Sequence, residues 1–211
     1  MLPIPLMARE YAAGMFALLL ERLAVSDTAR RNLVALWHEP HRRYHAAGHA
    51  GVLWHRHLAH GGDPDDAVIA HALAYHDAIY TVGARDNEAR SAALWRSDAA
   101  GLPVTLRDPV DRAIMATANH AGEHPDEVVQ WMVDLDLSPL GEPWPLFEAN
   151  TQALIDEAGA ACSATVLAGQ QVFFGTLARL PVLYRSRRHS RALARTYEVT
   201  ARENMTRVLA R

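Results

Sequence analysis

The segment AVIAHALAYHD, residues 67–77, is apolar along almost its whole length and ends on a histidine and an aspartate. A helix that is apolar on every side has to be buried, because none of its faces contacts water favourably. Burying His76 and Asp77 at the end of such a helix costs free energy unless both side chains find partners. The chain must therefore fold around this segment and bring polar groups or an ion to its end.

A divalent metal ion would be a partner for both side chains, because imidazole and carboxylate together suit ions such as Zn, Fe, Ni and Mn. Adjacent helical residues point about 100° apart, so two neighbours bind one ion most easily where their helix is ending. The loop at residues 81–85, which contains Gly83, indicates that the helix ends soon after them. Most of the twelve histidines fall between His38 and His76, and this clustering favours a metal site.

Two further acidic residues, Asp134 and Asp136, lie near the end of a second apolar helical pattern, PDEVVQWMVDLDL at residues 125–137. The carboxyl end of a helix carries the negative end of its dipole, which disfavours carboxylates. Two acids at that end, inside an apolar run, call for a compensating cation. The pattern is a second indication of a metal site, and it leaves open which aspartate is the ligand.

Two upstream histidines, His45 and His49, fall in a helix predicted over about residues 43–60. Their spacing of four residues places them on one helical face, so either could be the ligand from this helix. A lone histidine is weak evidence for a site. The other histidines nearby are interpreted as surface or structural residues: His38, His41, His55, His57 and His60.

Helical patterns of apolar residues, separated by proline and glycine, continue along the whole chain. The predicted helices cover about residues 6–23, 26–38, 43–60, 63–77, 86–100, 108–120, 125–137, 145–158, 163–180 and 188–210. Neither strand alternation nor an internal repeat is visible. We therefore predict an all-α fold with a single domain over residues 1–211. It would combine a metal-site core at about residues 43–141 with a C-terminal helical extension at about residues 145–211.

The composition of the chain, 211 residues with a formal net charge of −3, argues against several classes of function. A negative chain of this size is unlike a nucleic-acid binder, whose footprint is basic. The single cysteine, Cys162, excludes a disulfide within the chain and fits a reducing compartment. The apolar residues 2–20 include Arg9 and Glu10 and lack a basic start and a cleavage site. We therefore expect a cytoplasmic protein without a signal peptide or a membrane span.

A block of arginines precedes Glu198 near the C-terminus. It consists of Arg179, Arg185, Arg187, Arg188, Arg191 and Arg195. Such a block is usually a solvated face. Binding of an anionic substrate or of a nucleic acid is the alternative.

Four segments, in this order, resemble the HD superfamily of metal-dependent phosphohydrolases: RRYHAAGH, YHDAIYTVGARDNEARSA, TANHAGE and DLDLSPLG. The likeness is closest to one bacterial group of predicted phosphohydrolases in that superfamily. It covers about residues 43–141 and, more faintly, the AREN stretch around Asn204. A His-Asp pair is common by chance, whereas four ordered motifs at compatible spacing are far more specific. The resemblance implies an HD-type helical bundle and a hydrolase that depends on a divalent metal ion.

The resemblance also implies a set of metal ligands: His49, His76, Asp77 and Asp136. His49 is preferred to His45 because similar HD proteins place this ligand just before an apolar helical stretch. Asp136 is preferred to Asp134 because the superfamily's last aspartate usually precedes a leucine-rich turn. Many HD proteins have a basic residue after this aspartate, whereas Leu137 stands here, so the phosphate contacts differ. The ion itself is left open among Mn, Mg, Co, Ni, Zn and Fe.

The implied reaction is hydrolysis of a phosphate monoester, with nucleotides as the expected class of substrate. Glu88, or Asp86 beside it, is expected to position or deprotonate the attacking water. Contacts with the substrate are expected from Arg43, His45, Asn87 and His120. His120 and His124 are also the residues available for a second ion.

Two other classes of function stay open. An HD site that holds a pair of irons can be an oxygenase, which the extra histidines favour. The site can also bind a metal or a nucleotide as a sensor, without turnover. The expected partner is a small phosphate-bearing molecule, and a homodimer is an open alternative, whereas neither a membrane nor a nucleic acid is expected.

Overall fold

The computed structural model of the protein describes residues 9–187 and 197–211, and every element in these ranges is a helix. The predicted all-α fold is confirmed. In chain order the α-helices are α1 (Arg9–Glu21), α2 (Asp27–Trp37), α3 (Ala47–Ala59), α4 (Ala67–Tyr75), α5 (Asn87–Asp98), α6 (Val104–Ala116), α7 (Glu127–Leu137), α8 (Trp144–Ala178) and α10 (Val199–Leu209). The 3-10 helices η1 (Thr117–Asn119) and η2 (Ser138–Gly141) continue α6 and α7. Within the described ranges, no helix has both the length and the apolar character needed to cross a membrane.

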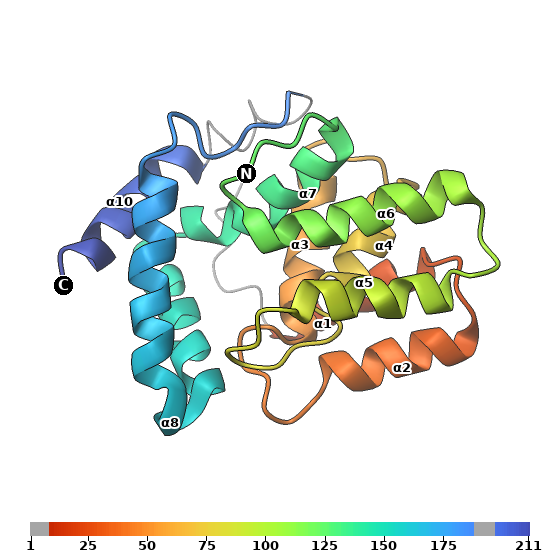
Figure 1. Cartoon of the computed structure of the whole chain (residues 1–211), viewed down its shortest axis with the longest axis horizontal. Helices are drawn as coiled ribbons and strands as arrows, with labels where there is room; N and C mark the ends of the chain where they lie inside the picture. The colour runs from red at the N-terminus through yellow and green to blue at the C-terminus, as the bar shows by residue number, and fades with distance from the viewer. Residues whose placement is uncertain (1–8, 188–196) are drawn as a thin grey trace.

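The centre of the bundle is α4, which packs against α1, α3, α5, α6 and α7. Its residues 69–75 are fully buried, as expected for a segment without a polar face. Figure 1 shows α5 and α6 in front of α3 and α4, with α2 below them. The end of α4, with its histidine and aspartate, therefore lies inside the bundle.

The helices α1 and α3 approach each other closely. At the point of contact, any side chain in place of Gly51 would collide with the backbone oxygen of Ala12. A glycine at residue 51 allows this approach because it has no Cβ atom. The contact fixes α3, and with it His49, against the rest of the bundle.

The long helix α8 bends at Gly159, whose backbone has φ 66° and ψ 171°. This φ lies in the left-handed region, which favours glycine. The sequence predicts two separate helices here, at about residues 145–158 and 163–180, and the structure joins them through the bend. In Figure 1, α8 stands to the left of the bundle and runs across the direction of α5 and α6, with α10 packed against it.

The start of α3 differs from the prediction. The helix begins at Ala47 rather than near residue 43, so His45 lies in the preceding loop and does not share a helical face with His49. The backbone N–H groups of residues 43–45 donate to Glu157 Oε2 at 2.8, 3.1 and 3.0 Å. Because Glu157 belongs to α8, the local sequence pattern contains no sign of this contact.

Two other helix starts are also displaced. α4 begins after Asp66 rather than at the predicted residue 63, and the side chain of Asp66 caps it by accepting a hydrogen bond from the backbone N–H three residues later at 3.0 Å. α6 begins at Val104, before the predicted start at residue 108, so Pro109 lies inside the helix. Packing of Val110 and its neighbours in the core outweighs the hydrogen bond that this proline cannot donate.

The basic block after residue 179 is partly described. Arg188, Arg191 and Arg195 lie outside the described residues, as do the first part of the helix predicted at 188–210 and residues 6–8 of the first predicted helix. Arg185 donates to the backbone oxygen of His120 at 2.6 Å, and Arg187 pairs with Glu127 at 2.7 Å. Arg185 attaches the C-terminal segment beside η1, whereas the side chain of Arg187 is 81% exposed and that of Arg179 is exposed, so the described part of the block is largely solvated.

A buried arginine, Arg56 of α3, joins the bundle to the C-terminal helices. Its side chain is 1% exposed, donates to Ser138 Oγ at 2.7 Å and forms an ion pair with Glu142, just before α8. Its guanidinium also lies over the ring of Tyr197, 5.2 Å from the ring centroid. Arg56 therefore connects α3 with η2 and with Tyr197, which lies just before α10.

Candidate metal centre

Four side chains from three helices meet inside the bundle: His49 of α3, His76 and Asp77 at the end of α4, and Asp136 of α7. His76 Nε2 lies 3.4 Å from His49 Nε2 and 3.1 Å from Asp77 Oδ2. Asp136 Oδ1 lies 3.2 Å from His49 Nε2 and 3.6 Å from His76 Nε2. The structure thus brings together the four residues that are expected as metal ligands, and we call them the His-Asp cluster.

The end of α4 orients His76 toward this cluster. His76 is the residue that caps α4, and its Nδ1 lies 3.0 Å from the backbone oxygen of Leu73. A backbone oxygen only accepts, so Nδ1 donates the proton of this hydrogen bond and Nε2 is directed to the cluster. Histidine ligands of metal ions are commonly fixed in this way through their other ring nitrogen.

Burial and charge act against each other in the His-Asp cluster. Burial lowers the pKa of His49, which favours the neutral form that can donate a lone pair to a metal. Burial also acts to lower the pKa of His76, but Asp77 and Asp136 outweigh it and raise this pKa well above its ordinary value. Burial would raise the pKa of both carboxyls, yet their histidine partners hold the pKa of Asp77 and of Asp136 below the ordinary range. The cluster therefore buries two charged carboxylates and attracts cations.

The spacing and chemistry of these donor atoms fit a metal ion. Two ligand atoms that each lie about 2.1 Å from one ion are roughly 3.0 Å apart at a right angle and 3.4 Å apart at the tetrahedral angle. The closest and widest separations given by the side chains of the cluster, 3.1 and 3.9 Å, lie near these values. His49, His76 and Asp77 could therefore hold a metal ion, and Asp136 has an oxygen within the same reach.

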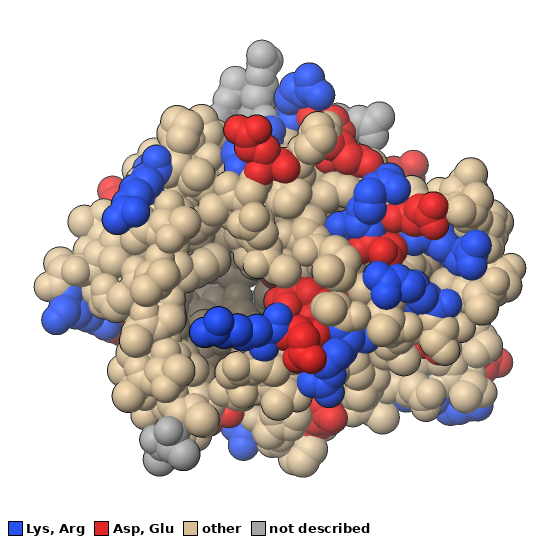
Figure 2. All heavy atoms as spheres, in the orientation of Figure 1, with Lys and Arg blue, Asp and Glu red and all other residues tan. Residues whose placement is uncertain are grey.

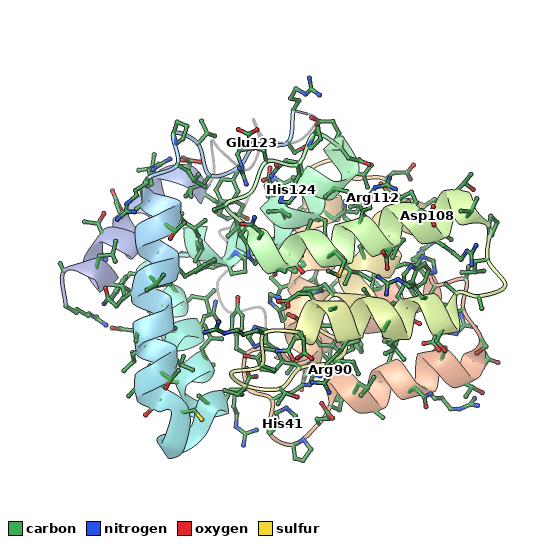
Figure 3. All side chains as sticks on the ribbon, in the orientation of Figure 1. His41, Arg90, Asp108, Arg112, Glu123 and His124 are labelled. Carbon is green, nitrogen blue, oxygen red and sulfur yellow. The ribbon has the colours of Figure 1, made fainter. Side chains whose placement is uncertain are left out.

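His120 adjoins the cluster and His124 does not. His120 Nε2 lies 2.7 Å from Asp136 Oδ2, the oxygen that faces away from His49. His124 is half-buried and donates from Nε2 to the backbone oxygen of Asn119 at 3.1 Å. Figure 3 shows His124 on the loop after η1, well apart from His41. Of the two histidines available for a second ion, only His120 contacts a residue of the cluster.

Asp134 is bound elsewhere. Its carboxylate accepts hydrogen bonds from Gln130 Nε2 at 2.9 Å and from the backbone N–H of Ser186 at 2.7 Å. Residues two apart on a helix point in nearly opposite directions, so Asp134 and Asp136 cannot both face the cluster. Burial raises the pKa of Asp134 to about 6, although its hydrogen bonds oppose this shift. Gln130 and the backbone at residues 185–186, rather than the His-Asp cluster, are the partners of this acid.

A second acid-histidine pair, His45 and Glu157, lies beside the cluster. His45 Nδ1 lies 2.6 Å from Glu157 Oε1, and the His45 ring stacks on Tyr80 with 3.9 Å between the ring centroids. Burial acts to raise the pKa of Glu157, but the hydrogen bond from His45 and those from the backbone lower it to about 2. Glu157 was not among the residues predicted for the site, because it lies in an ordinary polar position of α8, 112 residues away from His45.

Replacing Glu157 with glutamine should lower the free energy of unfolding by about 2 kcal/mol at neutral pH, because hydrogen bonds to a charged acceptor become bonds to a neutral one. The corresponding fall in Tm is about 5 °C for a chain of this size. The pKa of Glu157 is lowered by folding, so its contribution is present above its ordinary pKa of 4.5 and is lost as the pH falls toward 2. Thermal unfolding from neutral to acid pH should therefore show the two proteins converging, and equal Tm values at neutral pH would contradict the assignment.

Asn87 has a structural role that differs from the predicted contact with substrate. Its Oδ1 accepts from the backbone N–H of Thr81 at 2.9 Å, and its Nδ2 donates to the backbone oxygen of the same residue at 3.0 Å. Ser91, one turn later, bonds in the same way to Ile79. These two side chains hold the segment that follows Asp77 against α5, so the polar residues of the DNEARSA motif stabilise the end of α4.

Three other residues are predicted for the site: Asp86, Glu88 and Arg43. Within the described ranges, Asp86 and Glu88 have no side-chain hydrogen bond or ion pair, and the side chain of Asp86 does not cap α5. Arg43 donates to the backbone oxygen of Pro40 at 2.7 Å and lines a cavity that also reaches His49. Of these three residues, Arg43 is the one that the structure brings to the site.

Two cavities border the His-Asp cluster. The larger, about 700 Å³, includes Arg43, Tyr44 and His49 in its wall. The smaller, about 330 Å³, lies between the cluster and α8, and we call it the chamber; its wall includes His45, His120 and Asp136. Figure 2 shows a hollow on the face between α8 and the bundle, with a basic side chain across its mouth. A small molecule in the chamber can therefore contact a carboxylate of the cluster.

Comparison with protein-family models, with curated proteins and with solved structures found no match to this chain. The assignment of a function therefore rests on the motifs and on the geometry of the site.

Proposed function

We propose that the protein is a metal-dependent phosphohydrolase that releases phosphate from a monoester. The observation that supports this function is the His-Asp cluster, in which two imidazole nitrogens and two carboxylate oxygens converge beside a chamber. A divalent ion bound there would act as a Lewis acid, which lowers the pKa of water and offsets the charge of a phosphate. The ordered motifs that resemble the HD superfamily support the same activity and make nucleotides the first substrates to test.

Residues around the cluster would orient its ligands and the substrate. His120 holds Asp136 through Oδ2, which leaves Oδ1 directed at the two histidines of the cluster. His45 is fixed through Nδ1 by Glu157 and lines the chamber, so its Nε2 is available to a substrate. Arg43, from the neighbouring cavity, can contact a phosphate through its guanidinium.

We assign proton transfer to His45 in place of Glu88, because His45 lines the chamber and Glu88 contacts neither the cluster nor the chamber wall. His45→Asn should retain the metal and lower kcat by about 100-fold, the usual contribution of a positioned acid or base. Glu88→Gln should change kcat by less than about threefold, which is within the range of a residue outside the reaction. Steady-state kinetics with metal content measured in parallel would test this, and a large loss in Glu88→Gln with none in His45→Asn would restore the role expected from the sequence.

The activity can be tested with protein stripped of metal and then supplied with Mn, Mg, Co, Ni, Zn or Fe. Phosphate release would be measured from a general aryl phosphate and from nucleoside monophosphates. We expect no release without an ion and release with at least one of them. A protein that binds an ion tightly but hydrolyses no phosphate ester would reject the proposal and favour a sensor.

A second candidate is an HD-type di-iron oxygenase, and the position of His120 favours it. The two oxygens of Asp136 face different histidines, His49 and His120, as a carboxylate that bridges two ions would. Two equivalents of iron per chain together with oxygen consumption would support this candidate. One equivalent of a redox-inactive ion would exclude it.

A further inference from the structure

Gln170 of α8 is a buried polar side chain without a partner in the described part of the chain. The residue is 9% exposed, and neither its Oε1 nor its Nε2 has a hydrogen bond. A buried amide that lacks its hydrogen bonds costs about 1–3 kcal/mol of stability. Native proteins carry few such groups, and each calls for an explanation, which a bound ligand would provide.

The position of Gln170 indicates where that ligand lies. Gln170 forms part of the wall of the chamber, together with Asp136 and His120 at the end nearest the cluster. A molecule that fills the chamber can therefore contact the unpaired carboxamide of Gln170 and the cluster at the same time. The volume of about 330 Å³ lies at the small end of the range of ligand pockets, roughly 300–1,000 Å³.

The rest of the chamber wall defines the chemistry of the ligand. Three phenylalanines line it, and their rings contact one another: Phe147 with Phe174 at 5.9 Å and Phe173 with Phe174 at 5.7 Å between centroids. Aromatic walls favour flat, apolar faces. No arginine of the described residues lines the chamber, and the chain contains no lysine. A second phosphate or a carboxylate would therefore find neither an arginine nor a lysine of the described residues there.

We infer that Gln170 determines substrate specificity by forming hydrogen bonds to the organic group of the substrate. This group is a neutral, flat ring with an amide-like edge. A carboxamide presents one acceptor and two donors, so it pairs with an edge that places a donor beside an acceptor. The phenylalanines contact the faces of the ring while Gln170 bonds to its edge. One part of this inference rests on the proposed function: that the same molecule carries a phosphate, which would lie at the cluster.

The inference can be tested by binding, without turnover. The probes are four uncharged nucleosides, adenosine, guanosine, cytidine and uridine, and benzyl alcohol, which has a flat ring but no amide-like edge. Each would be titrated calorimetrically into the full chain as wild type, Gln170→Leu and Gln171→Leu. Gln171 is the matched control, because it bonds to the backbone oxygen of Val208 at 3.1 Å and does not line the chamber.

We expect at least one nucleoside to bind the wild type, and the affinity to fall about tenfold or more in Gln170→Leu, the loss expected for two hydrogen bonds. Gln171→Leu should bind nucleosides with the affinity of the wild type. The affinity for benzyl alcohol should be the same in all three proteins. Equal nucleoside affinity in Gln170→Leu and wild type would overturn the inference. Failure of every nucleoside to bind the wild type would overturn it as well.

A stability measurement separates recognition from a structural role. Because Gln170 has no partner among the described residues, Gln170→Leu should leave the Tm of the ligand-free protein unchanged or raise it. A large fall in Tm would show that Gln170 supports the fold, and would contradict the inference. If nucleoside binding depends on Gln170 but the protein releases no phosphate from any ester, the inference is retained and the proposed phosphohydrolase activity is rejected.

Discussion

Replacing His76 with alanine is expected to abolish metal binding and phosphate release together. His76 Nε2 lies within 3.1–3.6 Å of donor atoms on the three other residues of the cluster, so its loss removes the ligand that contacts all of them. Residues that merely orient a ligand contribute about 10- to 100-fold in metal affinity. Loss of the ligand itself should therefore weaken metal binding by more than about 100-fold.

The measurement is metal content per chain, by elemental analysis, on protein purified without chelator or nickel resin. His124→Ala is the matched control, because it also removes one histidine but lies outside the cluster, and in the described part of the chain its ring bonds to the backbone oxygen of Asn119. The wild type and His124→Ala should retain about one equivalent of metal, and His76→Ala should retain none. An equivalent retained by His76→Ala, or a wild type that binds no added ion, would contradict the assignment of the site.

Replacing Arg56 with methionine should destabilise the fold more than Glu157→Gln does. The change leaves Glu142 with a buried charge and no cation, and it removes the hydrogen bond to Ser138. Removing one partner of a buried ion pair costs about 3–5 kcal/mol. For a chain of this size the Tm should fall by about 10 °C, which thermal unfolding would show.

A double variant distinguishes the lost charge from lost packing. When both Arg56 and Glu142 are replaced by methionine, no buried charge is left unpaired, and apolar pairs of similar volume are often as stable as the ion pair. The double variant should therefore be more stable than Arg56→Met alone. If the second substitution adds to the destabilisation, packing rather than the unpaired charge explains the effect of the first.

The candidate metal site could be predicted where its residues lie in apolar helices. His76, Asp77 and Asp136 are polar residues inside or at the end of buried helical runs, and such residues need partners whatever the rest of the fold is. This requirement is local, so it can be seen in the sequence. The choice between Asp134 and Asp136 is not local, because it depends on Gln130 and Ser186, which satisfy the first and leave the second to the cluster.

Contacts between distant segments could not be predicted. Glu157 and Gln170 both belong to α8, and their positions opposite His45 and the chamber depend on how α8 bends and packs. Asn87 shows that a local pattern can also suggest a role without showing which contacts the side chain makes. A polar residue at a helix start, inside a motif, suggests a contact with substrate, and only the structure shows that both of its polar groups bond to Thr81.

The bend at Gly159 divides α8 into two arms, and both arms contribute phenylalanines to the chamber wall, Phe147 from the first and Phe174 from the second. The first arm carries Glu157, which holds the loop before α3, and the second carries Gln170 and Phe174 in the chamber wall. Gln170, which would select the substrate, thus lies in α8, whereas the four residues of the His-Asp cluster all precede this helix in the chain. A lineage descended from this protein could therefore change the molecule that the chamber would accept through substitutions in α8, at Phe147, Gln170 or Phe174, while it inherits the His-Asp cluster unaltered.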